Sequence, residues 1–316
     1  MIRKFITAIF VIFLLGGIVN GSDNSSIEAD QMLNKAKAEF MSGDHPRSLE
    51  IIDEYLQNNP PNASAWNLKG MIFLQNNSFM EAGESFSKAI ALNPDDTRLY
   101  YNAGLAAFHQ AELLRAEEYF NKSISDNFEI PEQFFYLGLA QYGLGKYPQA
   151  INSFKRSIEL FQEDPAVWLN LGNSYEQVRE FNRAILAYDE AIKLDPSFAK
   201  PWFLKGKIYI NHGEPEKAMV SFQNYTHLEP DDDSGWFWYA NSLRRADKQD
   251  DSLKALQKAI SLNPENQVYH EYLKIYDYGN ISGIMYDNIV TPLPHWVLSL
   301  AFALMVIFSI IAFIRR

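Results

Sequence analysis

The chain contains no cysteine among its 316 residues. This absence excludes disulfide bonds, cysteine nucleophiles, zinc sites built on thiolates and lipid attachment through an N-terminal cysteine. Histidine is also sparse, with six residues dispersed along the chain. No two of them have the i, i+4 spacing by which one helix face presents a pair of metal ligands. We therefore expect neither a metal site nor a cofactor.

The sequence also lacks the local patterns that carry common chemistries. It has no G-x-S-x-G nucleophile turn, no Walker-type phosphate loop and no G-x-G-x-x-G dinucleotide fingerprint. Its formal net charge is -11, opposite in sign to the basic surface with which proteins bind a phosphate backbone. We predict that the protein is not an enzyme, binds no nucleic acid and has no small-molecule substrate.

What the chain does contain is a period of 34 residues. The small residue of this period is Gly70, Gly104, Gly138, Gly172 and Gly206, and then Ala240. Four residues before each stands an aromatic residue: Trp66, Tyr100, Phe134, Trp168, Trp202 and Trp236. A third column is formed by Pro60, Pro94, Pro196, Pro230 and Pro264. Three columns in one register indicate tandem units that must stack to bury their apolar faces.

The best-defined unit, residues 165–198, resembles a tetratricopeptide repeat. That family's signature, W-x2-L-G-x2-Y followed by A-x3-F and P, is matched at Trp168, Leu171, Gly172, Tyr175, Ala184, Tyr188 and Pro196. Trp168, Leu171 and Tyr175 recur at helical spacing and so share one face of a first helix. The resemblance implies an all-α, right-handed superhelical solenoid of helix–turn–helix repeats.

The period sets the predicted boundaries. Seven repeats are expected at residues 29–62, 63–96, 97–130, 131–164, 165–198, 199–232 and 233–266, followed by a capping helix at 267–278. A polar lead at 22–28 precedes them and a linker at 279–295 follows. The first repeat is degenerate, with Met32 at the aromatic position, as is typical of terminal repeats. The acidic runs at 95–96 and 231–233 precede first helices, so we predict helix caps rather than a calcium loop.

Both ends of the chain carry apolar segments. Arg3 and Lys4 open an otherwise apolar stretch, so residues 1–21 are predicted to be a secretory signal peptide, with an uncleaved signal anchor as the alternative. Residues 296–314 carry no charge and are long enough to cross a bilayer, with the basic residues 315–316 on the cytoplasmic side. The predicted location is the cytoplasmic membrane, crossed once after signal cleavage, with the repeats extracytoplasmic. A processed sorting signal is the alternative for the tail.

Export fits the presence of N-glycosylation sequons. The candidate acceptors are Asn24, Asn62, Asn76, Asn121, Asn224 and Asn280. None of them falls on the predicted first-helix face described next.

The family resemblance implies where a partner binds, because positions 2, 5, 9, 12 and 13 of each first helix line the family's concave surface. Carried over, these positions give the first-helix face: Arg98, Tyr101, Leu105, Phe108, His109, Phe135, Leu139, Tyr142, Lys200, Phe203, Lys207, Ile210, Phe237, Asn241, Arg244 and Arg245. Aromatic residues with a basic patch at one end suit an extended peptide with apolar anchors and an acidic end. The alternative for Phe135 and Phe203 is packing between neighbouring first helices.

The same resemblance argues against binding of chaperone tails. Family members that hold a chaperone's terminal carboxylate do so with lysine, asparagine and arginine at set positions, where this chain has Leu169, Leu204, Ser234 and Trp238. We predict instead a membrane-anchored scaffold or adaptor that binds proteins or extended peptides on the extracytoplasmic side. The alternatives are a tail-anchored cytoplasmic adaptor and a structural cell-surface component.

Overall fold

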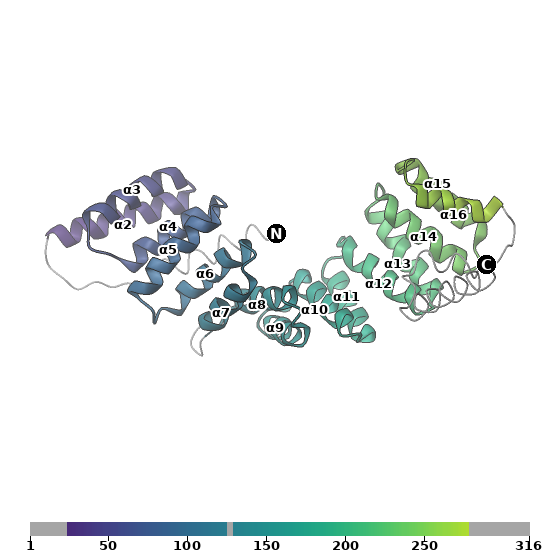
Figure 1. Cartoon of the computed structure of the whole chain (residues 1–316), viewed down its shortest axis with the longest axis horizontal. Helices are drawn as coiled ribbons and strands as arrows, with labels where there is room; N and C mark the ends of the chain where they lie inside the picture. The colour runs from purple at the N-terminus through teal and green to yellow at the C-terminus, as the bar shows by residue number, and fades with distance from the viewer. Residues whose placement is uncertain (1–23, 125–128, 278–316) are drawn as a thin grey trace, which may run out of the picture. The chain divides into compact units, whose positions relative to one another are not determined.

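The computed structural model describes residues 24–124 and 129–277, which form helices α2 to α16 and no strand (Figure 1). This confirms the all-α prediction for these residues. The predicted signal segment, the linker, the transmembrane segment, the basic end and Asn280 lie outside the described residues. Among the helices that are described, none combines the length and the apolar character needed to cross a membrane.

The helices alternate as first and second members of hairpins. The first members are α2 (Asn24–Ser42), α4 (Ala63–Gln75), α6 (Thr97–His109), α8 (Pro131–Gly143), α10 (Pro165–Gln177), α12 (Ala199–Asn211) and α14 (Asp233–Arg245). The second members are α3 (His45–Asn58), α5 (Phe79–Leu92), α7 (Leu113–Ser123), α9 (Tyr147–Leu160), α11 (Phe181–Leu194), α13 (Pro215–Leu228) and α15 (Gln249–Leu262), and α16 (Gln267–Asp277) follows. From α4 to α14, each first helix begins at the first residue of a predicted repeat.

The first helix differs from the prediction at its start. α2 begins at Asn24, within the stretch predicted as a polar lead, and not at Ala29. Neither glycine nor proline interrupts the sequence from Asn24 to Ser42, so no residue forces the chain out of the helical conformation. Gly43, at a φ of 88°, then follows the end of the helix.

A residue in the left-handed conformation connects the two helices of each hairpin. These residues are Gly43, Asn77, Ala111, Gly145, Arg179, Gly213 and Asp247, spaced by the repeat period. After α8, the amide of Lys146 donates to the carbonyl of Gln141 at 2.8 Å and that of Gly145 to Tyr142 at 2.9 Å. This pair of bonds is the Schellman arrangement, which satisfies carbonyl groups that the end of a helix leaves open. The same turn therefore recurs along the described chain.

Close approach of the two helices in a hairpin depends on the small-residue column. A Cβ atom on Gly70 would lie 2.5 Å from the ring of Phe86, and one on Gly138 would lie 2.6 Å from that of Phe154. Both rings are fully buried. The aromatic side chain of the second helix thus occupies the volume that a larger first-helix residue would need.

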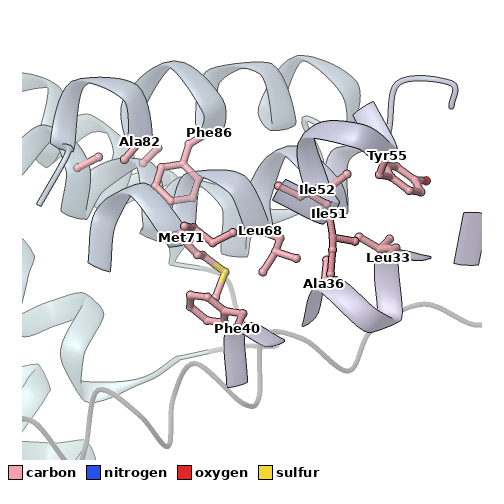
Figure 2. Close-up of a cluster of buried hydrophobic side chains, with 14 residues drawn as sticks. Leu33, Ala36, Phe40, Ile51, Ile52, Tyr55, Leu68, Met71, Ala82 and Phe86 are labelled. Atoms are coloured by element: carbon pink, nitrogen blue, oxygen red, sulfur yellow. The ribbon is translucent and has the colours of Figure 1, made fainter. Parts of the chain in front are cut away.

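The chain divides into two compact units between Ala187 and Tyr188, within α11. In the first unit, α2 to α6 contribute buried residues to one apolar cluster, and Figure 2 shows Met71 lying between the rings of Phe86 and Phe40. Figure 1 shows the two helices of a hairpin running side by side, as α4 and α5 do. The stacked hairpins place consecutive first helices next to one another within the unit.

In the second unit, α14, α15 and α16 share a further cluster. The ring of Tyr269 on α16 stacks on Phe237 at a centroid distance of 4.9 Å, and Tyr272 meets the same ring edge-on at 5.2 Å. Both tyrosines are buried. α16 therefore covers the apolar surface of the last hairpin, the role predicted for a capping helix.

Candidate functional site

The acidic runs before the first helices act as helix caps. Asp96 accepts a hydrogen bond from the backbone amide of Arg98, and Asp232 accepts one from Ser234. Asp233 accepts from the hydroxyl of Tyr269 at 2.6 Å. Within the described residues, no group of three metal-binding side chains comes together. The capping prediction is therefore confirmed for these two runs.

Two residues of the predicted first-helix face belong to the core of the first unit. Tyr101 and Leu105 on α6 are only 5% and 8% exposed. The ring of Tyr101 lies 6.1 Å from the buried ring of Phe120, and burial raises the pKa of its hydroxyl well above the ordinary value. A partner would contact neither residue extensively without unpacking this core.

Four other residues of that face remain half-buried, namely Phe108 on α6 and Phe135, Leu139 and Tyr142 on α8. Tyr136 joins the first two, because its ring contacts Phe108 at 5.7 Å and Phe135 at 5.4 Å, in both cases edge to face. We call Phe108, Phe135, Tyr136, Leu139 and Tyr142 the aromatic line. Buried residues of α9 and α10 back Phe135, Leu139 and Tyr142, whereas Phe108 and Tyr136 pack on buried residues of α6, α7 and α8. Packing and partial exposure thus coexist in the same side chains.

Tyr136 was missing from the predicted site. It stands one residue after the position-5 aromatic, outside positions 2, 5, 9, 12 and 13 from which the first-helix face was predicted. The equivalent residue in the last repeat is Trp238, also aromatic and half-buried. Aromatic residues at this position in two repeats were the sequence signal that could have identified both.

Arg98 and His109 lie at opposite ends of α6 and are already engaged. The guanidinium of Arg98 donates two hydrogen bonds of 2.8 Å to the carboxylate of Asp96. The ring of His109 stacks on Phe79 at 4.7 Å, and partial burial lowers the pKa of its imidazole. Neither residue joins the aromatic line, although Phe108 and His109 meet edge to face at 5.8 Å.

Glu132, in the first turn of α8, is an acidic residue of this face that the sequence analysis did not single out. Burial raises the pKa of its carboxyl group, and the negative charge of Asp164 adds to the effect. Its charge in turn contributes to the raised pKa values of Tyr101 and Tyr136, for which burial is the main cause. The first unit therefore presents aromatic and acidic groups together.

The face of the second unit is basic and aromatic. The ammonium of Lys200 lies 5.6 Å from the ring centre of Phe203, and that of Lys207 lies 5.6 Å from Trp238 on the next first helix. Phe203 itself is half-buried and packs on Tyr225 at 4.9 Å. Cations held over aromatic rings in this way gain a favourable interaction with the ring electrons.

The last repeat contributes two arginines and a buried amide. Arg244 donates from Nε to the hydroxyl of Tyr272 at 2.7 Å, and Arg245 donates from Nη1 to the carbonyl of Ile210 at 3.4 Å. Phe237 and Ile210 are buried. Asn241 is 1% exposed, and within the described residues its Oδ1 atom has no hydrogen-bond partner. A buried acceptor without a donor is costly, so this atom calls for a physical explanation.

The described sequons differ in their surroundings. Asn62 caps α4 by accepting from the amide of Ala65, and Asn224 donates to the carbonyl of Val220 on its own helix. Asn76 and Asn121 are exposed. Asn24 opens α2, and Asn280 is outside the described residues.

Comparison with known families settles the class of the repeats. One family model, a tetratricopeptide repeat, matches residues 33–96, 67–129 and 136–197 and alone covers half of the chain. A second model with the same description matches residues 187–219. The chain belongs to the tetratricopeptide repeat family. No curated protein sequence matches it.

Solved structures of other repeat proteins share the fold. A repeat-containing protein from Cytophaga hutchinsonii is 12% identical at a TM-score of 0.66, over 76% of this chain and 98% of that one. PilF of Pseudomonas aeruginosa is 20% identical at 0.55, over 69% and 98%. A tetratricopeptide repeat protein from Parabacteroides merdae is 16% identical at 0.54, over 78% and 98%. At these identities the likeness concerns the fold alone.

Proposed function

We propose that this tetratricopeptide repeat protein is a membrane-anchored interaction scaffold that binds an extended segment of a partner protein on its first-helix face. The observation that carries the proposal is the aromatic line of α6 and α8. Phe135, Leu139 and Tyr142 follow one another at intervals of four and three residues, so they project from one side of α8. Each is half-buried, which leaves part of its surface for a partner.

Such a surface favours apolar anchor residues in the partner. Aromatic side chains that are already fixed by packing lose little conformational entropy when a partner binds, and they contribute large contact areas. The edge-to-face contact of Phe135 with Tyr136 holds both rings in place. A peptide with spaced apolar side chains matches this arrangement better than a small polar metabolite does.

The membrane location rests on the two apolar ends of the sequence. Residues 296–314 are uncharged, and residues 1–21 have the basic start and short apolar core of an export signal. Together they support a single-pass protein with extracytoplasmic repeats. A tail-anchored cytoplasmic adaptor and a structural cell-surface component are the competing functions, and they differ from the first in the side of the membrane and in partner capture.

Photo-crosslinking in intact cells tests the binding face. A photoreactive amino acid at Leu139 is expected to capture a defined partner, and Tyr142→Ala is expected to reduce the yield because it removes an adjacent anchor. The same photoreactive residue at Lys155, which is exposed on the second helix α9, serves as the matched control. Equal capture from both positions, or capture unaffected by Tyr142→Ala, means that the aromatic line is not the binding surface.

A further inference from the structure

We infer that Asn76 is an N-glycosylation site of the folded protein, and that the sequons of Asn62, Asn121 and Asn224 are not used once the chain has folded. This inference rests on the extracytoplasmic location in the proposed function, and it selects one acceptor among the four sequons whose side chains the structure describes. The evidence is the state of two side chains in each sequon, the asparagine and the serine or threonine two residues later.

The sequon Asn76-Asn77-Ser78 forms the turn between α4 and α5. Asn76 follows the last residue of α4, Asn77 takes the left-handed conformation at a φ of 59°, and Ser78 precedes the first residue of α5. Asn76 is exposed, and among the described residues nothing hydrogen-bonds to its side chain or to the hydroxyl of Ser78. An enzyme can therefore reach both groups without displacing packed side chains.

The sequons of Asn121 and Asn224 lie on the second helices α7 and α13, and their hydroxyl residues belong to the core. Ser123 is fully buried, and its hydroxyl donates to a backbone carbonyl of its own helix at 2.7 Å. Thr226 is 3% exposed and donates in the same way at 3.1 Å. The amide of Asn224 also donates to a carbonyl of α13 at 2.8 Å. Each helix would have to unpack before an enzyme could bind these groups.

Asn62 is held by the start of α4. Its side chain is half-buried and accepts a hydrogen bond from the backbone amide of Ala65 at 3.2 Å, which caps the helix. Ser64, the hydroxyl residue of this sequon, is exposed but already lies in the first turn of α4. Drawing this sequon into an extended conformation would remove the cap and the first helical turn, which destabilises the helix.

Opening the turn at Asn76 requires only local changes. The backbone amides of Asn76, Asn77 and Ser78 donate to carbonyls of α4 at 3.1, 3.1 and 2.9 Å, and these bonds hold the turn. Asn76 and Asn77 are exposed and Ser78 is half-buried, so breaking the bonds uncovers no core residue. Local openings of this kind need far less free energy than the unpacking of a helix, and hence occur more often.

The reaction needs a lipid-diphosphate-linked oligosaccharide as its second substrate. Nδ2 of Asn76 forms a bond to the anomeric carbon of the first sugar, and the bond between this carbon and the diphosphate oxygen breaks. The amide nitrogen loses one proton, and the lipid diphosphate leaves with the electron pair of the broken bond. No oxidant or reductant takes part.

Transfer in vitro tests the site with the full-length protein in detergent micelles. The enzyme is a purified single-subunit oligosaccharyltransferase that accepts N-x-S/T without further sequence requirements, and peptide mass spectrometry locates each glycan. We expect Asn76 to be occupied at least about tenfold more than Asn121 or Asn224, because only its turn opens readily. Synthetic peptides that span the three sequons have no fold to protect them and should all be modified. Similar occupancy at the three sites of the folded protein, or a folded protein that is not modified at Asn76, overturns the inference.

Two substitutions at Ser78 separate recognition of the sequon from other effects. Ser78→Ala should abolish transfer to Asn76, whereas Ser78→Thr should retain it, and neither should change the Tm because the hydroxyl caps no helix. Ser64→Ala removes the sequon of Asn62 and is the matched control, which should leave the glycan at Asn76 unchanged. Transfer to Asn76 that persists in Ser78→Ala contradicts the assignment.

The protein isolated from its own cells completes the test. The peptide that contains Asn76 is expected to carry a glycan, and Asn76→Gln should remove the corresponding mass from the intact protein. If Asn76 is unmodified while a resident extracytoplasmic glycoprotein of the same cells carries its glycans, the inference is wrong. Photo-crosslinking from Leu139 that still depends on Tyr142 would then show that the proposed binding face stands and that only this site has failed.

Discussion

Gly138 of the fourth repeat is required because the facing helix leaves no room for a side chain. Gly138 has ordinary helical geometry, but a Cβ atom there would meet the ring of Phe154 at 2.6 Å. We predict that Gly138→Ala lowers the free energy of unfolding by about 2 kcal/mol, because the helices or the ring must move apart. Chemical denaturation monitored by circular dichroism measures the change.

The last repeat of the same chain provides the control for that prediction. There Ala240 stands in place of the glycine and the buried Leu256 stands in place of the phenylalanine on the facing helix. The methyl group of the alanine thus occurs together with a side chain smaller than phenylalanine. In the background of Phe154→Leu, the cost of Gly138→Ala should therefore become smaller than in the native chain. Equal costs in both backgrounds would show that the ring of Phe154 does not explain the glycine.

Glu132 is predicted to destabilise the fold at neutral pH. Burial raises its pKa above the unfolded value of 4.5, so the native state favours the protonated carboxyl. The native state then binds more protons than the unfolded state in the interval between the two pKa values, and stability falls as the pH rises through it. Glu132→Gln should raise the Tm at pH 7 and lose this advantage near pH 4. Glu163→Gln makes the same substitution at an exposed residue and serves as the matched control.

At the scale of the elements, the hairpin turns show the effect of backbone conformation without any steric clash of an added side chain. Gly145 has a φ of 73° with nothing within 4 Å of an added Cβ, and Ala111 occupies the same repeat position at a φ of 59°. We predict that Gly145→Ala lowers the free energy of unfolding by about 1 kcal/mol, because alanine is strained in the left-handed conformation. Ala111→Gly is expected to raise the free energy of unfolding, because it removes the same strain. Urea denaturation of both variants tests this. A destabilising Ala111→Gly would mean that the left-handed conformation is not what these positions require.

The helices were predictable from the sequence because the period does not depend on any one residue. Aromatic, glycine and proline columns 34 residues apart locate the first helices even where one column is interrupted. The proline column, for example, has Phe128 in the third repeat and Gln162 in the fourth. The start of α2 was not predictable in the same way. The polar residues before Ala29 tolerate a helix without requiring one, and the repeat pattern does not extend to them.

Side-chain partners were less predictable than helices. The family pattern gives the position of Arg98 on the first-helix face but not its double hydrogen bond to Asp96, which depends on the rotamers of both residues. The same limit applies to the contact between Lys207 and Trp238, which joins two helices from different repeats. Periodicity assigns residues to a face, whereas packing decides which of them remain accessible.

At the scale of the whole molecule, the family and its fold test neither the proposed membrane anchor nor the side on which the repeats lie, because the same repeat serves many functions. The absence of cysteine makes this question accessible to experiment, since one introduced thiol is the only thiol of the chain. Lys155 is exposed on α9, so Lys155→Cys should react with a membrane-impermeant maleimide in intact cells if the repeats are extracytoplasmic.

A buried thiol on the same helix supplies the matched control. Ser157 is 1% exposed, and its hydroxyl donates to the carbonyl of Pro131 at 2.8 Å. Ser157→Cys should therefore stay unlabelled until the protein is denatured, which shows that reaction at Lys155→Cys reports a folded repeat and not an unfolded chain. If Lys155→Cys reacts only after lysis, while a resident extracytoplasmic protein is labelled in intact cells, the repeats face the cytoplasm. The apolar tail would then act as a C-terminal anchor for a cytoplasmic adaptor, and the binding partner should be sought among soluble proteins brought to the membrane.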